Sequence, residues 1–201
     1  GTLMKAMSDD GAAFSLRVTA YIIGQILIGL DFAHSVRLDS GEQGIIHRDI
    51  SPQNILISNF GEVRIADFGV ARAVSEETSG ELRGKLGYLA PEQLQGGKLD
   101  ARVDLYAVGV LLHELADGSR FRQARDHNHM YSLVMSGELA PLRRTSLPKE
   151  LDRLREALLQ PDPSERVATA AEARELLGQW PGYGDASLEL RRVIAKYSGV
   201  D

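Results

Sequence analysis

The chain has 201 residues, of which 43% are hydrophobic and 25% charged. This composition predicts one folded domain, with at most a short appendage, and argues against a disordered chain. The net charge of −5 excludes the strongly basic surface of a nucleic-acid binder, and the absence of cysteine excludes disulfides, thiol nucleophiles and cysteine-ligated zinc. The longest apolar segment, Tyr21–Leu30, is too short for us to expect a membrane span, and no signal-peptide pattern opens the chain.

The first half of the chain predicts one long helix followed by a small hairpin. Apolar residues recur every three or four positions across Phe14–His34, which indicates a helix with one buried face. A polar, turn-like segment follows at 37–44 and predicts a loop. Two β-prone runs, Ile55–Ile57 and Val63–Ile65, then flank the turn residues Ser58–Gly61, so we expect a short antiparallel hairpin.

The second half predicts helices. A polar segment, 75–84, is expected to be an exposed loop. Beyond it, the apolar patterns predict a buried helix at Asp104–Leu115, amphipathic helices at Tyr131–Met135 and Leu151–Leu159, a helix from Thr169 to about Trp180, and a last one at Leu188–Tyr197. Thr169 and Glu172 form the capping-box pattern that opens a helix. The chain is therefore expected to be mainly α, with one small β hairpin.

Three short motifs stand in order along the chain. His47-Arg48-Asp49 is followed by Asn54, five positions after Asp49. Asp67-Phe68-Gly69 and Ala90-Pro91-Glu92 come next. With these motifs at this spacing, the chain resembles the large C-terminal lobe of the protein kinases, in particular the eukaryotic-like (Hanks-type) serine/threonine kinases of bacteria.

The resemblance implies the domain organisation. Residues 1–181 correspond to the kinase C-lobe, a helical bundle whose hairpin carries the catalytic and metal-binding loops, and residues 182–201 form a helical extension. No glycine-rich loop or strand lysine is present, and these belong to the small N-lobe. Since the chain begins with Gly1, we expect it to be part of a longer parent that supplies this N-lobe. The segment alone is then expected to be inactive.

The resemblance also implies the site residues. Asp49 would accept the proton of the attacking hydroxyl, and Asn54 and Asp67 would hold Mg²⁺ together with the ATP phosphates. A carboxylate can orient a hydroxyl and then take its proton, and Mg²⁺ prefers oxygen ligands. Leu56 would lie beneath the adenine. Structural roles fall to His47 and Phe68, to Asp104 as an anchor of the catalytic loop, and to an ion pair between Glu92 and Arg166.

Two positions depart from the serine/threonine kinase pattern. The lysine usually found two positions after the catalytic aspartate is Ser51 here, and the usual threonine of the activation segment is Lys85. Our hypothesis is an exchange of roles, in which Lys85 supplies the ammonium group and Ser51 the hydroxyl. The alternative is that Lys85 points to solvent and catalysis is impaired.

Arg48 implies regulation, because in the family this arginine pairs with a phosphate on the activation segment. Thr78 and Ser79 are the candidate phosphorylation sites. The alternative is a polar loop without such a role.

The function implied is transfer of the ATP γ-phosphate to serine or threonine hydroxyls of a protein substrate. Two alternatives stay open, a pseudokinase or interaction module with the same fold, and a small-molecule phosphotransferase. Tyrosine specificity is disfavoured by the Gly84-x-x-Gly87-Tyr88 segment. The expected partners are the protein substrate, ATP and the parent's own N-lobe, without nucleic acid or membrane contact from this segment. A cytoplasmic location is expected for the lobe, with a parent that other segments could anchor in a membrane.

Overall fold

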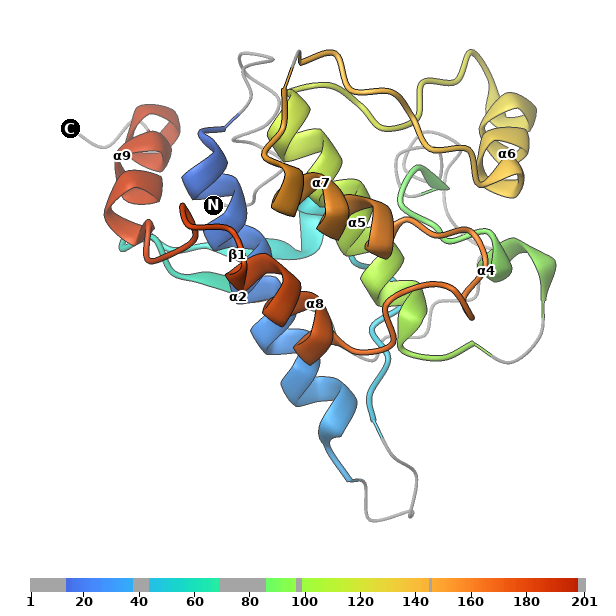
Figure 1. Ribbon diagram of the computed structural model, residues 1–201, viewed down its shortest axis with the longest axis horizontal. Helices are drawn as coiled ribbons and strands as arrows, with labels where there is room; N and C mark the ends of the chain where they lie inside the picture. The colour runs from blue at the N-terminus through green and yellow to red at the C-terminus, as the bar shows by residue number, and fades with distance from the viewer. Residues whose placement is uncertain (1–13, 38–43, 69–85, 97–98, 145, 199–201) are drawn as a thin grey trace.

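The computed structural model describes residues 14–37, 44–68, 86–96, 99–144 and 146–198 (Figure 1). Helix α2 (Leu16–Ser35) is the longest helix of these residues. The helix begins where the Ser15 hydroxyl accepts a hydrogen bond from the backbone N–H of Val18 at 3.2 Å. Its buried face contacts α5, α8 and strand β2. The predicted helix over Phe14–His34 is thus confirmed.

Helix α5 (Arg102–Asp117) lies in the interior, and every residue from Val103 to Ala116 is buried. It packs against α2 and α7 (Lys149–Leu158), and α7 packs in turn on α8 (Ala170–Gly178). At Gly109 a Cβ atom would lie 2.8 Å from side-chain atoms of α7 and its C-cap, so glycine permits the close approach of the two helices.

The predicted hairpin is present as β1 (Ile55–Ile57) and β2 (Val63–Ile65). The strands are antiparallel, and Ile55 pairs with Ile65. Gly61 in the turn adopts a φ of 82°, a left-handed conformation that favours glycine. Because β2 packs on α2, the hairpin holds a fixed position on the helical core.

Several smaller elements complete the fold (Figure 1). A 3₁₀ turn, η1 (Pro52–Asn54), leads into β1. Helices α4 (Glu92–Gln95) and α6 (His127–Ser136) contact each other. Thr169 caps α8 as predicted, since its side chain accepts from the N–H of Glu172 at 3.1 Å. That helix ends at Gly178, two residues before the expected end near Trp180.

Helix α9 (Ser187–Ser198) closes the described chain and belongs to the same hydrophobic core. Its Leu190 is fully buried and Ile194 nearly so. The carbonyl oxygen of Ser187, the first residue of the helix, lies so close to Gly61 that a Cβ atom on Gly61 would not fit. The helical extension therefore packs on the start of α2 and on the hairpin turn.

One sequence expectation about α2 was wrong. The apolar stretch was judged too short for a membrane span, whereas the helix is long and apolar enough to cross a bilayer by length and composition alone. As the predicted helix over Phe14–His34 requires, α2 runs without a break through Gly24, Gln25 and Gly29. Its packing against α5, α8 and β2 accounts for the apolar side chains, because a core helix needs them as much as a membrane helix does.

Candidate active site

Asp104 lies on the buried helix α5 and anchors the loop that contains His47, Arg48 and Asp49. One carboxylate oxygen accepts the backbone N–H of His47 at 2.8 Å, and the other accepts that of Arg48 at 2.7 Å. The side chain of Asp104 is fully buried, and its Oδ2 also lies 2.8 Å from Nε2 of His34. Two of these contacts hold the backbone just before Asp49 in place, and the third joins the carboxylate to the side chain of His34.

His47 connects this loop to the segment after β2. Its Nε2 lies 2.7 Å from the Ala66 carbonyl oxygen, and its Nδ1 lies 3.3 Å from the backbone N–H of Asp49. These contacts fit an imidazole that carries its proton on Nε2, donates to Ala66 from that nitrogen, and accepts from Asp49 at Nδ1. The Phe68 ring stands edge-on to His47, with centroids 4.8 Å apart. His47 is buried, and Phe68 is 37% exposed.

Asn54 and Asp67 come together with Asp49 at one edge of the hairpin. The Asn54 amide nitrogen donates to the Asp49 carbonyl oxygen at 2.7 Å and to its carboxylate at 3.0 Å. The backbone N–H of Ala66 donates to the backbone carbonyl oxygen of Asn54 at 2.8 Å. Asp67 follows Ala66 directly, so the structure brings the backbone of Asp67 next to Asn54, which is itself bonded to Asp49.

Arg48 and Asp67 are the two non-glycine residues in the described part of the chain with positive φ, at 65° and 58°. A left-handed backbone is disfavoured for residues with a Cβ, and such residues often mark functional sites. Arg48 is held by the bond from its N–H to Asp104. Both strained residues thus lie at the edge where Asp49 and Asn54 meet.

The donor atoms at this edge suit a hard cation. The Asn54 nitrogen is used by Asp49, and no hydrogen bond among the described residues engages the Asn54 side-chain oxygen. The Asp67 carboxylate is exposed. No cluster of three or more acidic or histidine side chains in the described ranges could hold a metal by itself. Mg²⁺ is typically held by one or two protein oxygens plus substrate phosphates, so Asn54 and Asp67 fit that ion.

Ser51 and Leu56 flank the same edge with opposite exposure. Ser51 is 1% exposed, and its buried hydroxyl has no hydrogen-bond partner among the described residues. Leu56, on the outer face of β1, is 44% exposed. A buried hydroxyl without a partner is costly, and an exposed leucine on a strand offers an apolar surface.

Lys85, Thr78 and Ser79 lie outside the described residues, so the structure places none of them. Arg48, the proposed phosphate partner, is described, and its side chain is exposed.

Glu92 and Arg166 form a two-pronged ion pair below the Ala90-Pro91-Glu92 segment. The guanidinium donates to the two carboxylate oxygens at 2.6 and 3.1 Å. Its remaining donors reach the carbonyl oxygens of Gln160, Arg102 and Pro161. All five N–H groups of a fully buried arginine side chain are thereby used.

Replacing Arg166 by methionine in the full-length protein is expected to lower the free energy of unfolding by about 3–5 kcal/mol, because Glu92 keeps a poorly solvated charge without a partner. The midpoint of urea unfolding measures the effect. The matched control is Arg174→Met, an exposed arginine of α8. Equal midpoints for both variants would contradict the expectation.

Two contributors to the site escaped the sequence reasoning. His34, at the end of α2, contacts the same Asp104 carboxylate oxygen that accepts the backbone N–H of His47. Gln93 caps the backbone N–H of Ala90 at 2.9 Å and donates to the Arg48 carbonyl oxygen at 3.4 Å, which links the Ala90-Pro91-Glu92 segment to the catalytic loop. Neither residue belongs to a motif, so only the tertiary structure reveals it.

Comparison with known proteins agrees with this geometry. The sequence model of the family described as the protein kinase domain matches residues 1–178 of this chain. The chain belongs to the protein kinase family. The resemblance to kinases and the expected mainly helical lobe with its hairpin are thereby confirmed, and protein kinases in general use ATP with a divalent metal ion.

Curated bacterial kinases are similar to this kinase lobe. The tyrosine-protein kinase MasK of Myxococcus xanthus is 36% identical over 148 residues, which cover 71% of this chain and 23% of MasK. The serine/threonine-protein kinase PknL of Mycobacterium tuberculosis is 41% identical over 121 residues (59% of this chain, 28% of PknL). A probable serine/threonine-protein kinase PknB of Corynebacterium glutamicum is 34% identical over 189 residues (88% and 28%). The chain thus spans less than a third of the length of these relatives.

Proposed function

We propose that this lobe belongs to a serine/threonine protein kinase and carries its catalytic base and its metal ligands. The observation that carries the proposal is the hydrogen-bonded grouping of Asp49 and Asn54, with Asp67 next to the residue bonded to Asn54. The buried Asp104 supports the proposal, because its bond to the backbone N–H of Arg48 also holds the next residue, Asp49, in position.

In this proposal each residue has a separate task. Asp49 orients the substrate hydroxyl and takes its proton as the oxygen attacks the γ-phosphorus of ATP; the bond to the leaving ADP oxygen breaks in the same transfer. Asn54 and Asp67 would hold Mg²⁺, which when bound neutralises the phosphate charge. Leu56 offers an apolar surface for the adenine. The left-handed backbone conformation of Asp67 sets the direction in which its side chain projects from the backbone.

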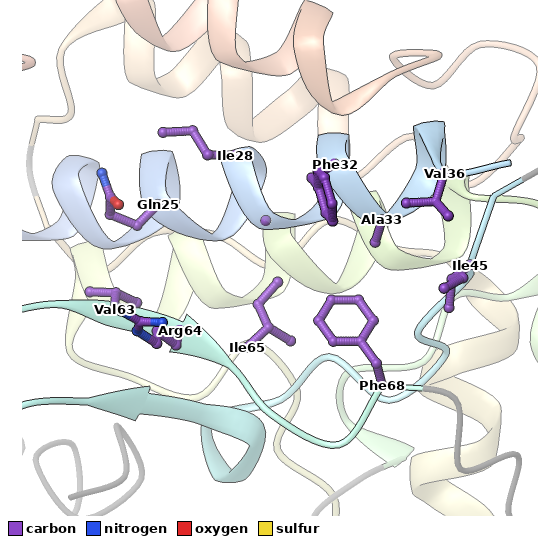
Figure 2. Close-up of a pocket in the computed structure, with 11 residues that line it drawn as sticks. Gln25, Ile28, Phe32, Ala33, Val36, Ile45, Val63, Arg64, Ile65 and Phe68 are labelled. Atoms are coloured by element: carbon purple, nitrogen blue, oxygen red, sulfur yellow. The ribbon is translucent and has the colours of Figure 1, made fainter.

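An apolar pocket beside the site supports a second lobe as a partner. The pocket, about 400 Å³ in volume, lies between α2 and β2 (Figure 2). Phe68 projects into it from below, and Phe32 and Ala33 face it from the helix (Figure 2). Phe32 is 74% exposed and Ile28 42%. We infer that the small lobe of the full-length protein covers this surface, since it is apolar and continuous with Phe68, next to the metal ligand Asp67.

The test is transfer of phosphate from radiolabelled ATP to a generic protein substrate by the full-length protein, with and without Mg²⁺, followed by identification of the phosphorylated amino acid. Phosphoserine or phosphothreonine is the expected product. Phosphotyrosine would instead favour the activity named for MasK, and ATP binding without transfer would favour a pseudokinase. The 201-residue chain alone is expected to transfer little or no phosphate, because half of the nucleotide site is missing from it.

The exchange of roles between Ser51 and Lys85 remains our hypothesis for the missing catalytic-loop lysine. The buried Ser51 hydroxyl, which has no partner, supports it, because an ammonium group arriving from the activation segment would satisfy that hydroxyl. The charge next to Asp49 would then be kept, although a different residue carries it.

Lys85→Ala in the full-length protein is expected to reduce kcat by about 10²-fold, the size of a lost transition-state charge contact. A double-mutant cycle with Ser51→Lys measures the coupling, and the combination of Ser51→Lys with Lys85→Thr is expected to restore activity. An unchanged rate in Lys85→Ala, or a folded but inactive double variant, would contradict the exchange.

A further inference from the structure

Arg122 is a buried arginine without a carboxylate partner. It follows α5 in the chain and is 7% exposed, and none of the ion pairs among the described residues includes it. Burial lowers the pKa of its guanidinium. Within the described part of the chain its Nε has no hydrogen-bond partner. A buried cation with these costs needs compensating contacts to be compatible with folding.

Those contacts converge on the loop formed by residues 86–91, called here the 86–91 loop, which ends at the start of α4. One guanidinium nitrogen, Nη1, donates to the carbonyl oxygens of Gly87 and Leu89 at 3.0 and 2.9 Å. The other, Nη2, donates to the Tyr106 hydroxyl at 2.6 Å. A planar guanidinium can reach these three acceptors at once, which a single ammonium group cannot do in the same geometry.

The guanidinium is also stacked between aromatic rings. Its carbon lies 5.4 Å from the centre of the Tyr106 ring and 5.2 Å from that of Phe121. The Tyr106 ring lies 4.9 Å from the guanidinium of Arg166, the partner of Glu92. Arg122 and Arg166 therefore contact the same ring, and one holds the 86–91 loop while the other holds the helix that follows it.

A second attachment holds the side-chain face of the same loop. The Tyr88 hydroxyl donates to the Glu114 carboxylate at 2.5 Å, and Arg120 contacts both groups. Burial, followed by the charge of Glu114, raises the pKa of Tyr88 far above its usual value, so the hydroxyl stays a donor. Tyr88 thus fixes where the loop sits, and Arg122 fixes which way its carbonyl groups point.

We propose that Arg122 is a positioning residue for protein-substrate binding, which sets the backbone of the 86–91 loop so that the loop can receive the peptide beside the transferred phosphate. The inference rests on the proposed kinase function. The loop adjoins the catalytic loop through Gln93, whose side chain bonds both Ala90 and Arg48. Without Arg122 the Gly87 and Leu89 carbonyl groups lose their donor and turn toward water. Peptide affinity then falls, while the edge formed by Asp49, Asn54 and Asp67 is unchanged.

The experiment uses the full-length protein with Arg122→Met and Arg122→Lys, and Arg153→Met as the control at an exposed arginine of α7. Hydrogen exchange over residues 86–96 and the separate KM values for peptide and ATP are measured. For Arg122→Met we expect faster exchange confined to this segment and a peptide KM raised by about tenfold, with the ATP KM unchanged. Arg122→Lys should be intermediate, and Arg153→Met should match the wild type.

Unchanged exchange over residues 86–96, or peptide and ATP KM values that rise together, would overturn the proposal. If Arg122→Met does not fold, Tyr106→Phe decides instead, since it removes a single acceptor of the guanidinium and keeps the ring; faster exchange at 86–96 supports the proposal and unchanged exchange overturns it. Exchange is measured without substrate. A full-length protein that transfers no phosphate would therefore contradict the kinase function, while the exchange data still decide the role of Arg122 in the loop.

Discussion

The Asp49→Asn variant of the full-length protein is expected to transfer phosphate about 10²–10⁴-fold more slowly than the wild type, the usual contribution of a general base. Asparagine has nearly the same shape, and its carbonyl oxygen can still accept the bond that Asn54 donates to the carboxylate at 3.0 Å. It cannot take the proton of the substrate hydroxyl. The loss should therefore appear in kcat, while the affinity for ATP, measured by equilibrium binding, stays unchanged.

A matched control is Asp31→Asn, which changes a half-buried aspartate on α2 that belongs to none of the three motifs. Its kcat is expected to equal that of the wild type. A kcat within tenfold of the wild type for Asp49→Asn would show that Asp49 is not the base.

The Asp104→Asn variant is expected to lose both stability and activity. An amide nitrogen in place of one carboxylate oxygen sets a donor against the N–H of His47 or Arg48, which now bond that carboxylate at 2.8 and 2.7 Å. One buried N–H is left unsatisfied, at a cost of about 1–3 kcal/mol in the free energy of unfolding. Because Arg48 has a left-handed backbone that this bond holds, its release should also displace Asp49.

Urea unfolding and kcat measure the two effects in the same variant. The control is Asp100→Asn, an exposed aspartate shortly before the same helix. If Asp104→Asn unfolded at the wild-type midpoint and kept its rate, the carboxylate would have no anchoring role.

The sequence predicted the elements whose patterns are local. The hairpin was expected at Ile55–Ile57 and Val63–Ile65, and the strands have these bounds, because alternating β-prone residues around a turn specify a hairpin without help from elsewhere. The buried helix around Asp104 followed in the same way from its dense apolar run. The resemblance to the kinases implied a site that contains Asp49 and Asn54, and the structure shows these two side chains bonded to each other.

Contacts between distant segments were not predictable in this way. Arg122 stands in a polar stretch after α5 that looks like an exposed loop, yet it is buried against a loop more than thirty positions earlier. The sequence around it contains no signal of that burial. The membrane-spanning length of α2 was misjudged because the expectation counted only the apolar segment Tyr21–Leu30, whereas the helix extends beyond that segment at both ends.

Helix α9 has a practical consequence for anyone expressing this domain. The family match stops at residue 178, whereas Leu190 and Ile194 are buried beyond it, and the Ser15 hydroxyl donates to Glu189 at 2.5 Å. An expression boundary at the end of the family match would remove side chains from the interior and leave the hairpin turn at Gly61 uncovered. The packed unit is thus longer than the family match, and α9 covers the hairpin turn as part of the same hydrophobic core.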